Sequence, residues 1–451
     1  MKKEIDNIFY KKMFAIAIPI AIQNFIYSSL NMIDTFMIGN LGGHKIAAVG
    51  AANKVFFLLN LILFGVCSGA AIFSAQFWGK KDKKSIKKVL GICLIIAISA
   101  SVFFTIAALF FGEYVMRIFS NEQEVIVPGA QYLKILSISY CFTGISFSYI
   151  NILRSTGEVK LPMKISVGAV LLNTLLNYVL IFGNFGAPAL GVRGAAIATT
   201  VARVLECSVL LYIVYKHEYV VAAKLNEMFS FTKEFVKEFF KKTLPVICNE
   251  FMWALGITVY SIVYGHMGSD SLAATTIAQT VEQIASVLFF GLGSACAVML
   301  GNELGSNENE KAYDYGKKFL ILTVNISFII SIIVIATSPL IANIFNVSDM
   351  VKRNIINCNI AFALFLPFKV FNLVNIVGVL RSGGDTKFSL MLDMGGVWCI
   401  GVPLVAISGL LLGLPVYIVY ALAYVEEIVK FIIGLIRFKS KLWVNNIVND
   451  M

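Results

Sequence analysis

Residues 39–55 read GNLGGHKIAAVGAANKV, and residues 265–281 read GHMGSDSLAATTIAQTV. At an offset of 226 the two stretches match at glycines and alanines along their length. At an offset of 227, LRSTGEVKLPM (153–163) matches LRSGGDTKFSL (380–390). Chance matches would not keep a nearly constant offset over most of a chain. The sequence therefore predicts an internal duplication.

The composition is that of a membrane protein. Of 451 residues, 58% are hydrophobic and only 14% are charged, and the mean hydropathy is +0.82. A soluble protein of this length carries about 25% charged residues. Apolar runs long enough to cross a bilayer as helices recur throughout, which predicts an all-α polytopic fold with twelve transmembrane helices. The expected spans are 13–38, 51–77, 89–112, 129–152, 163–184, 193–215, 244–266, 272–302, 319–345, 357–380, 388–411 and 414–436.

The basic residues predict the orientation. Most Lys and Arg residues fall on alternate connections, among them GKKDKKSIKK (79–88), the linker 216–242 and the tail RFKSK (437–441). Such connections lie in the cytoplasm, so both termini are expected there, in the cytoplasmic membrane. The net charge of +11 follows from this distribution, and no nucleic-acid partner is expected.

The duplication and the twelve spans together predict the domain organisation. Residues 1–215 and 244–451 each hold six spans, with residues 216–243 between them as a cytoplasmic linker that carries an amphipathic helix. An even number of spans leaves both halves in the same orientation, related by a pseudo-twofold axis along the membrane normal. Transporters that work by alternating access often have this arrangement.

The sequence also limits the energy source. It contains no GxxxxGK[ST] phosphate-binding loop and no soluble stretch large enough for an ATPase domain. Transport would then be secondary, and a carboxylate within the membrane is the natural group to couple it to an ion. Without a cluster of His, Cys or paired Asp at the membrane interface, the chain is not expected to be an enzyme, and no cofactor is expected beyond the coupling ion.

Several segments carry a resemblance to a known family. They are PIAIQNFIYSSLNMIDTFMIG (19–39), QFWGKKD (76–82), LRSTGEVKLP (153–162), NTLLNYVLIFGNFGAPALGVRGAAIAT (173–199) and LRSGGDTK (380–387). In this order and spacing, the chain resembles bacterial members of the multidrug and toxic compound extrusion (MATE) family. The resemblance implies two six-helix lobes in a V shape that export organic cations in exchange for H⁺ or Na⁺.

The resemblance also implies a coupling site in the first half. The first-span aspartate of the family is Asp34 here, and it is grouped with an Asn-x-x-x-Asp pattern in the fifth span. That pattern reads Asn173-Thr-Leu-Leu-Asn177, so an amide replaces the second carboxylate. The loss of one negative charge favours protonation of Asp34, although a Na⁺ site at Asp34, Asn173 and Asn177 stays open. Gln23 and Thr199 are expected neighbours.

A second coupling residue is expected in the seventh span. The family glutamate usually stands about eight residues after the proline, whereas Glu250 follows Pro245 by five. Glu250 is taken as a coupling candidate, with pairing to a group such as Lys369 as the alternative. Glu282 and Asp393 are expected to join it in one cavity. The candidates for substrate contact are Gln23, Thr199, Asn249, Tyr260, Glu282 and Asp393.

Two further pairs of membrane charges are expected to be structural, because their spacing places them on one helix face. They are Glu426 with Lys430 and Arg203 with Glu206. The chain is thus expected to be a monomeric antiporter for small organic cations. The alternative is a flippase for a lipid-linked oligosaccharide or another amphiphile, which is typically lined by a strongly cationic cavity.

Overall fold

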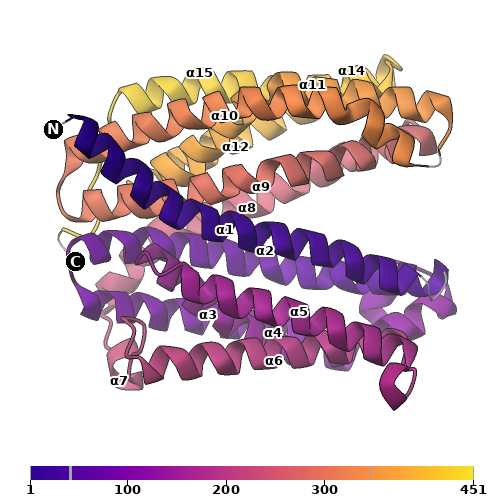
Figure 1. Ribbon diagram of the computed structural model, residues 1–451, viewed down its shortest axis with the longest axis horizontal. Helices are drawn as coiled ribbons and strands as arrows, with labels where there is room; N and C mark the ends of the chain where they lie inside the picture. The colour runs from indigo at the N-terminus through magenta and orange to yellow at the C-terminus, as the bar shows by residue number, and fades with distance from the viewer. Residues whose placement is uncertain (1, 40–42, 346, 450) are drawn as a thin grey trace. The chain divides into compact units, whose positions relative to one another are not determined.

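The computed structural model describes residues 2–39, 43–345, 347–449 and 451, and these residues form helices and short connections without any strand (Figure 1). The apolar composition explains this, because a helix satisfies its own backbone polar groups where water is absent. The helices are α1 Lys2–Gly39, α2 Gly43–Gly79, α3 Lys83–Arg117, α4 Gln123–Ser155, α5 Lys160–Phe182, α6 Val192–Lys216, α7 Leu225–Met228, α8 Lys233–His266, α9 Ser269–Gly305, α10 Asn309–Ile344, α11 Asp349–Leu373, α12 Thr386–Gly396, α13 Val402–Ala406, α14 Val416–Ala423 and α15 Val425–Lys439; a 3₁₀ turn, η1, covers Asn184–Gly186.

Ten helical segments of the described chain are long and apolar enough to cross a membrane. They correspond to the second to the eleventh predicted spans. The first predicted span falls on α1, and the twelfth falls on α14 and α15, which only Tyr424 separates. The prediction of an all-α polytopic membrane fold is confirmed.

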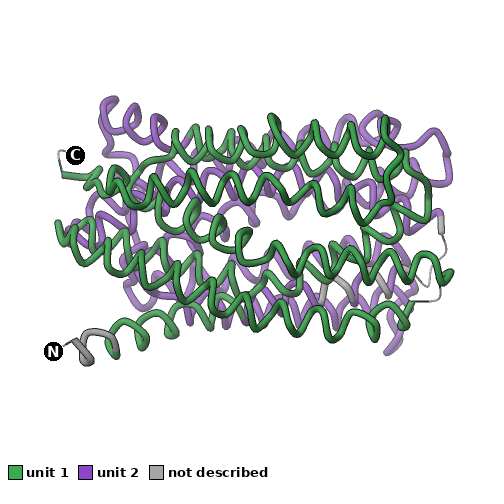
Figure 2. Tube along the Cα trace, turned by 90° about the horizontal axis from the view of Figure 1, so that it is seen from above, with its two compact units in different colours: residues 1–21, 244–451 green, residues 22–243 purple. Residues whose placement is uncertain are grey.

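The chain divides into two compact units (Figure 2). The N-terminal unit is Ile22–Thr243, and the C-terminal unit is Met1–Ala21 together with Leu244–Met451. The unit boundaries therefore fall inside α1 and α8. The division into lobes at 1–215 and 244–451 stays a prediction.

Residues 1–21 belong to the C-terminal unit because an aromatic residue anchors them there. The ring of Phe9 is fully buried and lies 5.0 Å from Tyr315 and 5.1 Å from Phe319, measured between centroids. Aromatic side chains bury large apolar areas, so this contact fixes the first turns of α1 on α10.

The linker packs on the N-terminal unit. The short helix α7 lies against α3, where a side chain at Gly91 would meet the backbone of Met228 at 2.1 Å. The predicted amphipathic helix is not a separate element: it forms the first turns of α8, which continues to His266. Its buried Phe239 stacks on Phe73 with ring centroids 5.4 Å apart.

Three π-helical stretches interrupt the last helices of the C-terminal unit. They are η2 Val374–Leu380, η3 Val397–Gly401 and η4 Ile407–Leu411. A π-helical turn accommodates an extra residue in a helix and frequently marks a functional position. The described helices of the N-terminal unit contain none, so the two repeats differ in backbone geometry as well as in sequence.

Candidate functional site

The N-terminal unit brings Asp34 together with three of its predicted neighbours. The amide nitrogen of Asn177 donates to Asp34 Oδ1 at 2.8 Å and approaches Asn173 Oδ1 at 3.4 Å. Asn173 in turn donates to Thr199 Oγ1 at 3.2 Å. Asn173 and Asn177 are four residues apart, so both project from one face of α5 toward α1 and α6. The result is a chain of polar groups in which Asp34 supplies the charge.

One acceptor in this chain is unused. The side-chain oxygen of buried Asn177 has no hydrogen-bond partner within the described part of the protein. A protonated Asp34 could donate to this oxygen if the Asn177 amide turned over. The site can therefore hold Asp34 in either its charged or its neutral form with a hydrogen bond to the same neighbour.

Gln23 belongs to another contact. Although it lies on α1 like Asp34, its side-chain oxygen accepts a hydrogen bond from Arg154 Nη2 at 2.5 Å. Gln23 is 2% exposed, so a buried neutral acceptor holds the partly exposed Arg154. The expected position of Gln23 beside the Asp34 group stays a prediction.

The predicted pairing of Arg203 with Glu206 is confirmed. The guanidinium of Arg203 lies 2.7 Å from Glu206 Oε2. Glu206 Oε1 accepts from Ser166 at 2.7 Å and from Tyr27 at 3.2 Å. With both carboxylate oxygens bonded, the buried Glu206 serves as a tie between α1, α5 and α6.

In the C-terminal unit, Glu250 pairs with an arginine. Arg381 Nη2 lies 2.8 Å from Glu250 Oε1, and the Arg381 side chain is 2% exposed. Glu250 is therefore paired, as the alternative interpretation predicted, but its partner is Arg381, and the suggested Lys369 pairs with Glu282. Loss of either partner would leave the other as an uncompensated charge inside the protein.

Glu282 forms a separate contact set. Besides Lys369, it accepts hydrogen bonds from Tyr424 at 2.5 Å and from Tyr420 at 3.3 Å. The ammonium of Lys369 also lies 5.1 Å from the ring centroid of Tyr424, a cation–π contact. Glu282 is therefore compensated by its own lysine and does not share bonds with Glu250.

Asp393 belongs to a third set, centred on Lys430. The Lys430 ammonium lies 3.2 Å from one oxygen each of Asp393, Glu426 and Glu427. The predicted pairing of Glu426 with Lys430 is thus confirmed, but it is part of a larger group. Glu250, Glu282 and Asp393 thus belong to three separate contact sets among the described residues, and their expected place in one cavity stays a prediction.

The remaining candidates attach to this third set. Asn249 donates to Asp393 Oδ2 at 3.2 Å, and Tyr260 donates to Glu426 Oε2 at 3.0 Å. We refer to Asp393, Glu426, Glu427 and Lys430 as the Lys430 cluster. Sequence reasoning missed Glu427, although it directly follows Glu426 and stands three residues before Lys430, a spacing that places it beside the same lysine.

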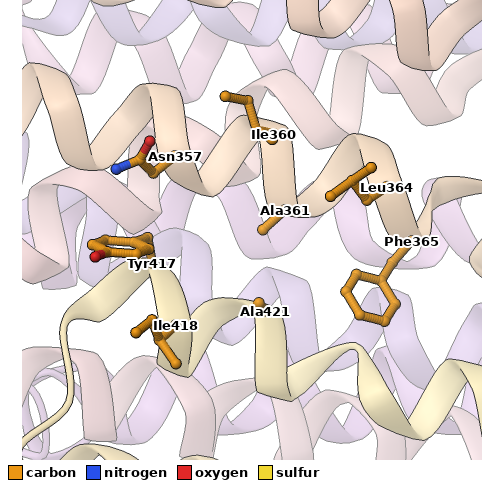
Figure 3. A pocket seen from close by; sticks show the side chains of 8 residues that line it. All are labelled: Asn357, Ile360, Ala361, Leu364, Phe365, Tyr417, Ile418 and Ala421. Carbon is orange, nitrogen blue, oxygen red and sulfur yellow. The ribbon is translucent and has the colours of Figure 1, made fainter.

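The C-terminal unit also has an open groove of about 310 Å³ between α11 and α14 (Figure 3). Its lining is apolar apart from Asn357 and Tyr417 at one end. None of the predicted site residues lines it, and without a charged group it offers nothing to couple to an ion.

Comparison with known proteins gives a consistent result. The family model described as MatE matches residues 19–179 and 245–407, which together make up more than half of the chain. The chain is 26% identical to the uncharacterized transporter YisQ of Bacillus subtilis, over 98% of this chain and 97% of that protein. It is 24% identical to the probable multidrug resistance protein NorM of Thermotoga maritima, over 89% and 86% of the two chains.

Solved structures show the same fold. A MATE protein in complex with MaL6 superimposes with a TM-score of 0.87 at 22% identity, covering 96% of each chain. A transporter of the MOP superfamily from Pyrococcus furiosus, described as having a binding pocket of reverse polarity, gives a TM-score of 0.85 at 23% identity, again over 96% of each chain.

Proposed function

Because the chain belongs to the MatE family of transporters, we propose that it is a secondary antiporter that exports small organic cations in exchange for protons. The observation that carries the proposal is Asp34, a carboxylate within the first membrane helix whose amide partner Asn177 carries no charge. A charge in this environment is costly and is usually kept for function.

Alternating protonation of Asp34 would couple the two fluxes. In its ionised form, Asp34 accepts from Asn177 and attracts a cationic substrate. A proton taken up from the outside removes that charge and converts the carboxyl into a donor, for which the unpaired Asn177 oxygen is an acceptor. The cation then loses its electrostatic hold and leaves, and release of the proton to the cytoplasm resets the site.

Sodium is the less favoured ion at this site. Na⁺ prefers oxygen ligands with enough negative charge to replace its hydration shell, as do other hard cations. The side-chain oxygens of Asp34, Asn173, Asn177 and Thr199 can supply ligands, but Asp34 is the one carboxylate among these four residues. The described residues contain no group of three or more His, Cys, Asp or Glu side chains that could hold a metal ion.

Export of cations is favoured over flipping of an anionic lipid. A flippase of lipid-linked pyrophosphates needs cationic side chains that are available to the substrate. The cations Arg154, Lys369 and Arg381 are bound by Gln23, Glu282 and Glu250, respectively. They would have to give up these partners before they could bind an anion, at a substantial cost in free energy.

Efflux from proteoliposomes tests the proposal. A fluorescent organic cation is loaded, and a pH gradient or a Na⁺ gradient is imposed separately. We expect the pH gradient alone to drive efflux in the parent protein, and Asp34→Asn to lose at least tenfold in rate. The matched control is Asp270→Asn, because Asp270 is exposed at the start of α9. Efflux by Asp34→Asn at the parent rate would refute the coupling role.

The proposed orientation places both termini in the cytoplasm of a bacterial cell and treats the protein as a monomer. The exposed Ser440, just after α15, gives a site for a test. A cysteine introduced there should react with an impermeant reagent only when the reagent reaches the cytoplasmic side. Labelling of intact cells would contradict the orientation, and a larger mass in light scattering would contradict the monomer.

A further inference from the structure

The buried charges of the C-terminal unit are balanced in all but one of the contact sets found among the described residues. Glu250, Glu282 and Asp385 each meet one cation. The pairs are Glu250 with Arg381, Glu282 with Lys369 and Asp385 with Arg437. The Lys430 cluster instead has three carboxyl groups and one ammonium. With all of these groups ionised, it would carry two uncompensated negative charges.

The geometry around Lys430 leaves no room for a second cation at its centre. One oxygen from each of Asp393, Glu426 and Glu427 lies 3.2 Å from the Lys430 ammonium. The ammonium donates hydrogen bonds to Asp393 and Glu426 and forms an ion pair with Glu427. The lysine occupies the position that a bound metal ion would need.

Neutral donors hold the outer oxygens of the three carboxyl groups. Tyr260 donates to Glu426 at 3.0 Å, Asn249 to Asp393 at 3.2 Å and Asn372 to Glu427 Oε2 at 2.7 Å. These contacts orient the carboxyl groups and connect α8, α11, α12 and α15. Because the donors are neutral, the excess of negative charge in the cluster remains.

The cluster is screened from solvent. Lys430 is 3% exposed, Glu426 5% and Glu427 7%. Two glycines next to the π-helical turn η3 let the backbone approach closely: a side chain at Gly401 would meet the Tyr260 hydroxyl at 1.8 Å, and one at Gly396 would meet Lys430 Cδ at 2.7 Å. A net charge of −2 in such surroundings is costly, because low polarizability strengthens repulsion between like charges.

Hydrogen-bond accounting points in the same direction. The side-chain oxygens of Asn249 and Asn372, both at least nine-tenths buried, have no donor within the described structure. Both amides already donate to a carboxyl group of the cluster, so these oxygens lie in its immediate surroundings. Two buried acceptors without a donor therefore lie beside a group that already has an excess of negative charge.

We propose that the Lys430 cluster is a proton-binding site, separate from Asp34, that holds at least one proton at neutral pH. The proton resides on a carboxyl oxygen of Asp393 or Glu427. The net charge of the cluster then falls from −2 to −1.

Neighbouring titratable groups do not remove the excess. Beyond Tyr260, the next group on α8 is Tyr264, which interacts electrostatically with Glu426 and Glu282. Glu282 on α9 is neutralised by Lys369, and Asp385 on α12 is neutralised by Arg437 on α15. Neither tyrosine carries a positive charge in any state. The extra charge of the cluster must therefore be met within it.

Infrared spectroscopy of the full-length protein tests this site without any transport assay. The carbonyl stretch of a protonated carboxylic acid is separate from that of a carboxylate. In an Asp34→Asn background we expect this band at neutral pH, where ordinary exposed Asp and Glu are ionised. It should decline as the pH is raised. Absence of the band at neutral pH would overturn the proposal.

Variants of the cluster give effects of opposite sign. Glu427→Gln or Asp393→Asn removes one negative charge permanently and should abolish the band at neutral pH. Lys430→Met leaves three carboxyl groups without their cation and should enlarge it. The matched control Asp385→Asn removes a carboxylate from a one-to-one pair and should leave the band unchanged. A band that survives Asp393→Asn combined with Glu426→Gln and Glu427→Gln, or one that shrinks in Lys430→Met, would refute the assignment.

Folding can be checked separately in each variant by its amide band and by gel filtration. The measurement in the Asp34→Asn protein needs no change within the cluster, so it decides the question even if a cluster variant misfolds. Its outcome is also independent of the proposed export function. A band in a protein that exports nothing would support this site and refute only the transport proposal.

Discussion

Each repeat contains a contact in which an arginine donates to a side chain at the same sequence separation, but the acceptor is neutral in one repeat and a carboxylate in the other. Gln23 accepts from Arg154 in the N-terminal unit, and Glu250 accepts from Arg381 in the C-terminal unit; both pairs are 131 residues apart in sequence. The two arginines are equivalent in the repeated LRS motif. Duplication has kept the contact between the first and fourth spans of each repeat, but the acceptor is neutral in one and charged in the other.

This difference separates the two coupling candidates. Glu250 forms an ion pair with a buried arginine, so its use as a coupling group would require that pair to break, at a substantial cost in free energy. Asp34, in the other unit, accepts a hydrogen bond from the neutral amide of Asn177, and Arg203, whose charge also acts on Asp34, is ion-paired with Glu206. A group that must gain and lose a proton in each cycle is better placed beside an amide than beside a guanidinium. The comparison therefore favours Asp34.

The largest expected effect comes from removing the two arginines in turn. Arg381→Met leaves the Glu250 carboxylate buried without its cation, which costs about 3–5 kcal/mol of unfolding free energy. Arg154→Met leaves only the neutral Gln23 without its donor, at about 1–3 kcal/mol. Thermal or denaturant unfolding of the purified proteins in detergent measures both.

A double variant makes this comparison sharper. Glu250→Gln in the Arg381→Met protein should recover most of the loss, because it removes the uncompensated charge. The same acceptor change is already present in the N-terminal unit, so no equivalent rescue exists for Arg154→Met. Equal losses for the two arginine variants, or no recovery in the double variant, would show that charge does not distinguish the two contacts.

Hydropathy and repetition suffice to predict the spans and the duplication, because lipid exposure imposes the same requirement on every helix. Charge pairs within one helix, such as Arg203 with Glu206, follow from spacing alone. Partners on different helices do not. Lys369 was the expected alternative partner of Glu250, yet it faces Glu282, because packing decides which helix faces meet. Arg154 and Arg381 appeared to be cytoplasmic-edge cations, whereas both are bonded in the interior.

The grouping around Asp34 was available only through the family resemblance. The spacing of Asn173 and Asn177 predicts a shared helix face, but nothing in the sequence says that this face meets α1. The Lys430 cluster had no such guide. Its members come from two helices and its neutral donors from α8 and α11, so only the three-dimensional structure reveals that three carboxyl groups share one lysine.

An effect of intermediate size is expected from a substitution that restores the second carboxylate of the N-terminal unit. Asn177→Asp would place a second carboxylate next to Asp34 and should strengthen the binding of Na⁺ relative to the parent. Na⁺ at about ten times its dissociation constant would then stabilise the variant by roughly 1.4 kcal/mol. Thermal unfolding in Na⁺ and in choline measures the difference. Asn151→Asp, where the native amide donates to Phe147 O of its own helix, is the control. Stabilisation of the parent by Na⁺ would instead favour sodium as the native coupling ion.

The smallest expected effect concerns the linker, whose charged side chains lie outside the membrane-spanning helices. The pKa of Glu227 is lowered by the backbone N–H of Lys224 and by the ammonium of Lys87, which lies 2.9 Å from Glu227 Oε1. A carboxyl group with a lowered pKa stabilises the folded form at pH values above its ordinary pKa of about 4.3. This stabilisation is lost as the pH falls through the lowered pKa of the folded form. The attachment of α7 to α3 should therefore loosen in acid.

Hydrogen exchange at the amides of residues 224–229 reports this attachment directly. Protection, corrected for the intrinsic pH dependence of exchange, should fall below about pH 4 in the parent. Glu227→Gln should lower protection at neutral pH and remove its dependence on acid. Glu234→Gln, an exposed carboxylate in the first turn of α8, should change neither. Because the pair is exposed and screened by salt, the expected change is small and should shrink further at high ionic strength. Protection that is insensitive to both acid and salt would mean that the apolar contact of Met228 with α3 holds the linker without help from this ion pair.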